Sequence, residues 1–198
     1  MQPAAPFLGL TGGMGAGKST ALAVLQRLGA EVLSSDDVVH ELYGGEQLLA
    51  AATGRWGPEV APGGVIDRAA VAERAFANAE DRAWLEGVVW PLVGERVAVW
   101  LAQVRARTPP PRAAVVEVPL LFEAGLQELY DATIAVVADE QLRRRRAAGR
   151  GHALLEERGA RQLSQEEKAR RATFVVCNDG TEEDLERELS AVLGKLGR

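Results

Sequence analysis

The sequence predicts an α/β fold in which helices flank a parallel β-sheet. Short apolar runs of strand length alternate along the chain with segments whose apolar residues recur at helical spacing. The first half of "AAVVEVPLLFE", which begins at Ala113, and the run "ATIAVVA" at 132–138 are continuous apolar runs of the kind that is buried in a parallel sheet. A glycine-rich loop joins the first apolar run of the chain, at 7–11, to the first helical segment. Together these features favour parallel strands connected by helices.

The amino-terminal part of the chain predicts a strand, a loop, a helix and a second strand. The first strand is expected over 7–11, and the helix that follows the loop is expected to end at Gly29. The second strand is expected over 30–34 and leads into Asp36 and Asp37. Of these two, Asp37 is the expected cap of the next helix, because aspartate is a favoured cap residue.

The pattern then becomes helical up to about residue 107. Asp67 is expected to cap a helix that begins at Arg68, and Asn78 is expected to cap a longer one. The longer helix carries a broad apolar stripe, which is typical of a helix that packs along one face. The stripe consists of Leu85, Val88, Val89, Leu92, Val93, Val97, Trp100, Leu101 and Val104.

The rest of the chain returns to strands alternating with helices. A proline-rich connection at 108–112 precedes a third strand, and the fourth strand, over 132–138, is followed by Asp139 as a helix cap. A fifth strand is expected over 174–178. Two further helix starts resemble a capping box, a hydroxyl residue with an acidic residue three positions later. They are Ser164 with Glu167 and Thr181 with Asp184.

Composition limits the compartment and the partners of the protein. The chain has 198 residues, 47% of them hydrophobic, and a net charge of −5, which argues against nucleic-acid or membrane-surface binding. Cys177 is the only cysteine, so an intramolecular disulfide is excluded. No basic residue precedes the first apolar run, and no run approaches the roughly 20 residues of a membrane helix. We expect a cytoplasmic monomer or weak homo-oligomer without nucleic-acid or membrane partners.

The loop between the first strand and helix matches the phosphate-loop pattern G-x-x-x-x-G-K-[ST] in full. Its backbone N–H groups and the helix amino terminus are expected to cradle the phosphates of ATP, with Lys18 bridging them and the Ser19 hydroxyl ligating Mg²⁺. The nucleotide-binding residues are expected to be Gly13, Met14, Gly15, Ala16, Gly17, Lys18, Ser19 and Thr20.

Other interpretations of this loop are weaker. A ligand-free glycine turn would not need the full spacing in its strand–helix context. A dinucleotide-binding loop expects an acidic residue about 20 positions on, near Asp36 and Asp37, but does not call for the Lys-Ser pair. GTPases use base-reading sequences such as N-K-x-D, which are absent. The size of the chain and its helical insertion favour a small-metabolite kinase.

Motifs along nearly the whole chain resemble the dephospho-coenzyme A kinase family. They are "GLTGGMGAGKS" at 9–19, "GAEVLSSDDVVHEL" at 29–42, "DRAAV" at 67–71, "WP" at 90–91, "VPLLFEAGL" at 118–126, "QLRR" at 141–144 and "ATFVVCNDG" at 172–180. The resemblance implies a single kinase domain over 1–198 with a P-loop kinase fold of the nucleoside-monophosphate-kinase type. Within it we expect a nucleotide-binding core at 1–39 and 108–198, a helical acceptor-binding lobe at 40–107 and a lid at 141–165.

The resemblance implies ATP, Mg²⁺ and dephospho-coenzyme A as ligands and assigns roles to several residues. Asp36 is expected to face the acceptor hydroxyl and accept its proton, at the end of a strand where open α/β sheets place functional groups. Arg144 matches the lid arginine that contacts the transferring charge, while the next lid arginine is either Arg146 or Arg150. Arg158 and Gln162 resemble a further lid spacing.

Four other residues are candidates for the site. Arg68 is expected to meet acceptor phosphates, Asn178 to lie near adenine, and Glu123 to belong to the acceptor site, although Asn178 is equally compatible with a simple turn. Glu117, within a buried strand, needs a partner, which is expected to be Mg²⁺ through water, Ser19 or a structural ion pair.

Three positions depart from the family pattern: Ser34 and Thr173 replace aspartates, and Trp90 replaces a histidine. The rival hypotheses are a nucleoside-monophosphate or other small-metabolite kinase, and a nucleotide-dependent regulatory switch, which the missing aspartate at Ser34 would suit. A switch would bind nucleotide with negligible turnover.

Overall fold

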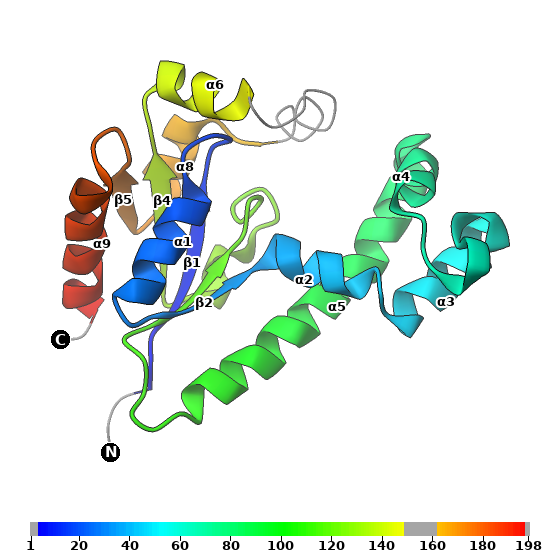
Figure 1. The fold of residues 1–198 in the computed structure, drawn as a ribbon, viewed down its shortest axis with the longest axis horizontal. Helices are drawn as coiled ribbons and strands as arrows, with labels where there is room; N and C mark the ends of the chain where they lie inside the picture. Colours follow the sequence, from blue (N-terminus) through cyan, green and yellow to red (C-terminus); the bar gives the residue numbers. More distant parts are fainter. Residues whose placement is uncertain (1–3, 149–161, 197–198) are drawn as a thin grey trace. The chain divides into compact units, whose positions relative to one another are not determined.

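A computed structural model describes residues 4–148 and 162–196 in two compact units. Unit 1 contains the chain up to Leu33 and from Leu101 onward, and unit 2 spans Ser34–Trp100. Unit 2 is therefore inserted between two stretches of unit 1 (Figure 1). It overlaps the predicted acceptor lobe at 40–107.

Unit 1 is built on a five-stranded parallel sheet, as the sequence predicts. The strand order is β2-β3-β1-β4-β5, with β1 in the centre (Figure 1). In β1 every residue is buried, and its Leu10 is paired with Glu117 on one side and Ile134 on the other. The strands span Phe7–Gly12 (β1), Glu31–Ser34 (β2), Ala114–Glu117 (β3), Ala132–Val137 (β4) and Phe174–Cys177 (β5).

Helices cover this sheet. Helix α1 (Lys18–Arg27) packs beside α9 (Glu182–Leu196), and α8 (Gln165–Arg171) packs on β1 and β4. A short 3₁₀ turn, η3 (Leu126–Leu129), precedes β4, and helix α6 (Glu140–Ala148) follows β4. Alternate residues of the strands and the apolar faces of α1 and α9 form the main core. Its large members include Leu8, Leu10, Val24, Leu25, Ile134, Val136, Leu185 and Leu189.

The three helix starts predicted in the second half of the chain are confirmed. Asp139 Oδ1 accepts the N–H groups of Gln141 and Leu142 at 2.9 and 3.3 Å. The Ser164 hydroxyl accepts Glu167 N–H at 3.2 Å. Thr181 and Asp184 bond each other's backbone N–H groups reciprocally. Each cap therefore fixes the residue at which its helix begins.

Unit 2 is helical. Its elements are α2 (Ser35–Leu42), α3 (Glu46–Trp56), the 3₁₀ turns η1 (Pro58–Val60) and η2 (Pro62–Gly64), α4 (Arg68–Phe76) and most of α5 (Ala79–Arg105). Asp67 and Asn78 cap α4 and α5 as predicted. On α5, Val89 and Val104 are buried and the other predicted stripe residues are half-buried. All four tryptophans lie in unit 2, where Trp56 and Trp84 meet edge to face.

No described helix combines the length and the apolar composition that crossing a membrane requires.

Candidate active site

The phosphate loop connects β1 to α1, as the sequence predicts. Gly15 and Gly17 have φ values of 74° and 92°, which residues with a Cβ rarely adopt. Ala16 N–H donates to Gly13 O at 3.2 Å and tightens the loop. Gly17 is the N-cap of α1, so the free N–H groups of the first helical turn begin where the loop ends. This arrangement suits a phosphate group, because helix amino termini attract anions.

Lys18 holds its ammonium group beside the loop. Its Nζ donates to the carbonyl oxygens of Gly12 and Gly13 at 3.2 and 3.4 Å. It also lies 3.9 Å from Glu117 Oε1, at the end of β3. The buried Glu117 carboxylate therefore has a cationic neighbour, which is the partner that its position in a strand requires.

The residues expected at a magnesium ion lie around the same loop. Ser19 and Thr20 are exposed in the first turn of α1, while Met14 is half-buried and Ala16 is buried. The described ranges hold no group of three or more His, Cys, Asp or Glu residues that could bind a metal. Mg²⁺ bound to nucleotide keeps several waters and takes only one or two protein oxygens. The Ser19 hydroxyl, with Glu117 behind water, fits that requirement.

Asn178 supports the loop from the end of β5. Its side-chain amide donates to Ala16 O at 2.9 Å, and a Cβ at Gly17 would collide with it. Its backbone carbonyl accepts Arg146 Nη1 at 3.1 Å. The structure thus brings Asn178 to the phosphate loop, and its proximity to adenine stays a prediction.

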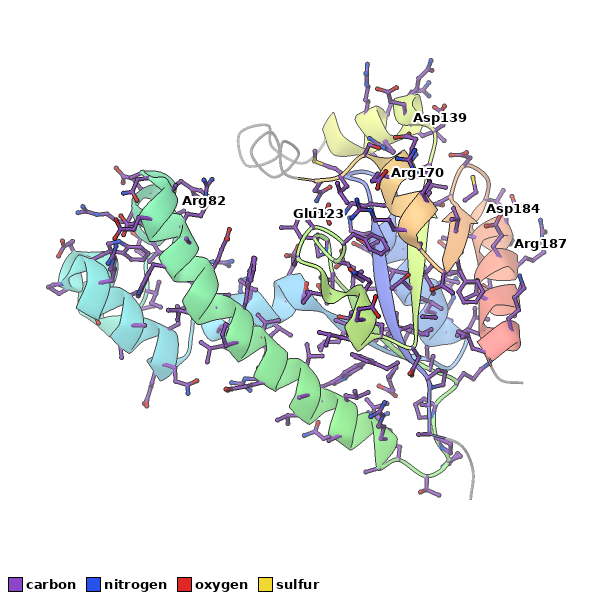
Figure 2. The ribbon with its side chains drawn as sticks, turned by 180° about the vertical axis from the view of Figure 1, so that it is seen from behind. Arg82, Glu123, Asp139, Arg170, Asp184 and Arg187 are labelled. Atoms are coloured by element: carbon purple, nitrogen blue, oxygen red, sulfur yellow. The ribbon has the colours of Figure 1, made fainter. Side chains whose placement is uncertain are left out.

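Glu123 belongs to a buried ion pair that the sequence analysis did not anticipate. Its Oε1 lies 2.9 Å from Nζ of Lys168, a residue of α8 that is fully buried. Lys168 also donates to the hydroxyl of Thr11 and the carbonyl of Pro119, and Glu123 Oε1 accepts Leu163 N–H at 2.8 Å. Figure 2 shows Glu123 in the loop after β3. The carboxylate expected at the acceptor site therefore ties α8 to the strand ends. The one sequence feature that singles out Lys168 is composition, since it is one of only three lysines in the chain.

The arginines of α6 have different surroundings, and the expected contact of Arg144 with the transferring charge stays a prediction. Arg144 forms an ion pair with Glu140 on its own helix, and 78% of its side chain is exposed. Arg143, which the sequence analysis did not single out, lies against the loop instead: a Cβ built on Gly13 would be 3.1 Å from its Nη1. Helical spacing was the missed signal, because Arg143 and Arg146 are three residues apart and share a face.

Most of the remaining residues of the predicted lid lie outside the described part of the chain. Arg150 and Arg158 lie outside the described residues, and so does most of the predicted lid at 141–165. Gln162 is half-buried in a bend before α8.

In unit 2, Asp36 is exposed in the first turn of α2. The predicted cap of this helix is wrong: Ser34, not Asp37, is the N-cap, and its hydroxyl accepts Asp37 N–H at 3.3 Å. Ser34 has the extended backbone of a cap residue, whereas Asp36 and Asp37 are already helical and benefit from the helix dipole. A serine can fill the place of the family's aspartate as a cap, since both residue types accept this bond.

Arg68 opens α4 within a polar cluster of unit 2. Its guanidinium lies over the ring of Tyr43, 4.9 Å from the ring centre, and its Nη1 is 2.5 Å from His40 Nδ1. Because arginine only donates, His40 accepts through Nδ1. The exposed guanidinium stands at a helix start, where an acceptor phosphate remains a predicted ligand.

Thr173 and Trp90, the other two positions that differ from the family pattern, have different surroundings. Thr173 and Thr133 bond each other's backbone N–H groups at 3.0 and 3.1 Å and join β5 to β4. Trp90 is 53% exposed on α5.

The ends of β4 and β5 are linked by a carboxylate. Cys177 Sγ and Asp139 N–H both donate to Asp179, at 3.0 and 2.5 Å. These bonds lower the pKa of Asp179, and the Asp179 carboxylate raises the pKa of the Cys177 thiol. A raised pKa lowers the fraction of thiolate, which is the nucleophilic form of the side chain.

Comparison with known proteins agrees with this geometry. The family model described as dephospho-CoA kinase matches residues 6–184. A curated dephospho-CoA kinase of Deinococcus radiodurans is 40% identical over 192 residues, covering 96% of this chain and 91% of its own. A crystal structure from Thermus thermophilus has a TM-score of 0.79 at 36% identity, covering 98% and 99% of the two chains.

More distant kinases share only the fold. A shikimate kinase of Acinetobacter baumannii has a TM-score of 0.54 at 16% identity, covering 96% of this chain and 94% of its own. The fold is thus that of P-loop small-molecule kinases, as predicted. With a matching family model over most of its length and full-length relatives of the same name, the chain belongs to the dephospho-CoA kinase family.

Proposed function

We propose that the chain transfers the γ-phosphoryl group of ATP to the ribose 3′-hydroxyl of dephospho-coenzyme A, giving ADP and coenzyme A. The observation that carries the proposal is the family match over 6–184, which includes both the phosphate loop and unit 2. Nucleoside-monophosphate kinases share the loop, but they lack the family's "PLLFE" segment at 119–123.

The chemistry asks the protein mainly to position groups and neutralise charge. A bond forms between the acceptor oxygen and the γ-phosphorus, and the bond to the β,γ-bridging oxygen breaks. The loop backbone and Lys18 hold the phosphates through N–H groups and a positive charge. Ser19 is the residue that would hold Mg²⁺, with Glu117 through water, and the bound ion neutralises phosphate charge.

Asp36 is the proposed acceptor of the hydroxyl proton. It is an exposed carboxylate in a helical first turn, so it is accessible to a substrate hydroxyl. Arg68, with its guanidinium over Tyr43, is the proposed contact for acceptor phosphates.

The test is a coupled assay of ADP release with Mg-ATP and one of dephospho-coenzyme A, AMP, dTMP, shikimate or no acceptor. We expect turnover with dephospho-coenzyme A alone. Asp36→Asn should lower kcat by about 10²–10⁴-fold, the usual contribution of a general base. Asp37→Asn, the neighbour in the same helical turn, is the matched control and should retain near-wild-type kcat.

Each alternative has its own outcome. Turnover with AMP or shikimate instead would assign a different acceptor. ATP binding without turnover on any acceptor would favour a regulatory switch. Equal activity of the Asp36 and Asp37 variants would remove Asp36 as the base. Light scattering of the purified chain tests the expected monomer or weak homo-oligomer.

A further inference from the structure

Four consecutive arginines on α6 lie in different surroundings. Residues three apart share a helix face, so Arg143 and Arg146 point to one side, and Arg144 and Arg145 to others. Arg143 is half-buried, whereas Arg144 and Arg145 are exposed. Arg146 is exposed as well, but its Nη1 donates to the Asn178 carbonyl, so the face that Arg143 and Arg146 share contacts other parts of unit 1.

Arg143 rests on the phosphate loop with both its backbone and its side chain. A Cβ on Gly15 would collide with the backbone carbonyl of Arg143. A Cβ on Gly13 would lie 3.1 Å from Nη1, 3.4 Å from Cζ and 3.8 Å from Nε of the guanidinium. The glycines at these positions leave room for α6, and the guanidinium lies along the loop segment that is expected to hold phosphate.

The guanidinium is incompletely satisfied. Among the described residues, Nε of Arg143 is buried and has no hydrogen-bond partner. A buried donor without an acceptor costs free energy, and arginine cannot lose its proton to avoid that cost. Phosphate oxygens are acceptors that match the guanidinium fork and its charge.

Arg144 lacks these features. It is held by Glu140 one turn earlier, and its side chain is 78% exposed. Arg143 has an acidic neighbour in Glu166 on α8: the pKa of Glu166 is lowered mainly by hydrogen bonds of its own backbone and of Ser164, and to a smaller extent by the charge of Arg143. A purely structural role would rest on that attraction.

We propose that Arg143, and not Arg144, is the arginine of this chain that binds the phosphate groups held by the loop and stabilises the transferring charge. The assignment deepens the proposed function and rests on it for the identity of the nucleotide. Arg146, on the same face, holds the Asn178 carbonyl at 3.1 Å and thereby fixes the orientation of that face.

The test measures ligand binding apart from turnover. Wild type, Arg143→Gln, Arg144→Gln and Arg145→Gln are titrated with inorganic tripolyphosphate, ADP and ATP by calorimetry, without acceptor. Arg143→Gln should weaken tripolyphosphate and ATP about tenfold or more, the effect of losing a charged hydrogen bond. Arg145→Gln, the exposed neighbour on another face of α6, should keep affinities within about twofold of wild type. Arg143→Lys should recover only part of the lost affinity, because lysine lacks the planar guanidinium fork.

Thermal melts separate a ligand role from a structural one. If Arg143 binds phosphate, Arg143→Gln without ligand should melt no lower than wild type, while its gain in Tm on adding tripolyphosphate should shrink. A lower Tm without ligand and an unchanged gain would overturn the proposal, as would a loss confined to Arg144→Gln.

The outcome is independent of the acceptor. If dephospho-coenzyme A is not phosphorylated but Arg143→Gln still loses tripolyphosphate, the arginine assignment stands and the proposed function fails. If wild type turns over dephospho-coenzyme A and Arg143→Gln binds tripolyphosphate normally, the proposed function stands and the assignment fails.

Discussion

The two units of the chain differ in whether they bury polar side chains. Among its described residues, unit 1 buries five that are polar or charged, whereas every buried side chain of unit 2 is apolar. The five are Thr11, Glu117, Thr133, Lys168 and Asn178. Ion pairs of unit 2 lie at or near the surface: Arg74 and Glu59 are both more than half exposed, and Arg55 pairs with the exposed Glu80 and the half-buried Asp81.

This difference follows from what each unit is built around. In unit 1, polar groups converge on the phosphate loop and the strand ends, and they bond one another inside the protein. Removing one leaves its partner buried and unsatisfied, which is costly. In unit 2, water replaces a lost partner at a surface pair. Substitutions of polar groups should therefore be more costly in unit 1 than in unit 2.

The largest effect is expected for Lys168→Met. The variant removes the cation beside Glu123 and leaves a largely buried carboxylate, which should lower the free energy of unfolding by about 3–5 kcal/mol. Urea denaturation followed by circular dichroism measures it. Tryptophan fluorescence is recorded in parallel, because all four tryptophans report on unit 2.

Two variants sharpen that result. Lys195→Met removes an exposed lysine of α9, near the ring of Phe174, and should cost much less. Adding Glu123→Leu to Lys168→Met should restore part of the loss, since no buried charge remains. Equal losses for Lys168→Met and Lys195→Met would show that burial of the Lys168–Glu123 pair does not raise the cost of losing the cation.

An intermediate effect is expected from Tyr130 in alkali. Burial raises the pKa of Tyr130 to about 12, so the folded state holds the hydroxyl proton that the unfolded chain releases near pH 10. The associated stability is fully present below pH 10 and is lost as pH rises toward 12, by roughly 2 kcal/mol. Tyr130→Phe should remove this part of the alkaline loss.

Tyrosinate absorbance gives an independent check of that pKa. The chain has two tyrosines, so a Tyr43→Phe variant reports Tyr130 alone. A single transition near pH 10 in the folded variant would contradict the raised pKa.

The smallest effect is expected in unit 2, for Asp67→Ala. Asp67 Oδ1 accepts the N–H groups of Ala69 and Ala70 at 2.9 and 3.2 Å, and loss of such a cap costs about 1 kcal/mol. Tryptophan fluorescence during urea denaturation is the measurement. Asp37→Ala, at a first-turn position of α2 that is not a cap, should lower the free energy of unfolding by less. A larger loss for Asp37→Ala than for Asp67→Ala would indicate that Asp37, and not Ser34, caps α2.

Local patterns predicted most of the fold because strands, helices and caps depend on residues close in sequence. The alternation of elements and the caps Asp67, Asn78 and Asp139 are confirmed. The cap of α2 was mistaken since Ser34 and Asp37 are both good caps, and the choice depends on where the backbone leaves the extended conformation.

The site was less predictable because its contacts join distant segments. The phosphate loop was evident from its spacing, whereas the pair of Glu123 with Lys168 spans 45 positions and leaves no local pattern. Helical spacing groups Arg143 with Arg146, but only the packing of α6 decides which face meets the loop.

The central position of β1 has a consequence for synthesis on the ribosome. Both neighbours of β1, strands β3 and β4, begin after residue 113, and all of unit 2 is translated before them. Translation proceeds at about 5–20 residues per second. Strand β1, which is fully buried in the folded protein, therefore waits several seconds for its hydrogen-bond partners. Nascent chains that end before residue 113 should accordingly bind holdase chaperones through their first strand, and chains that extend past β4 should release them.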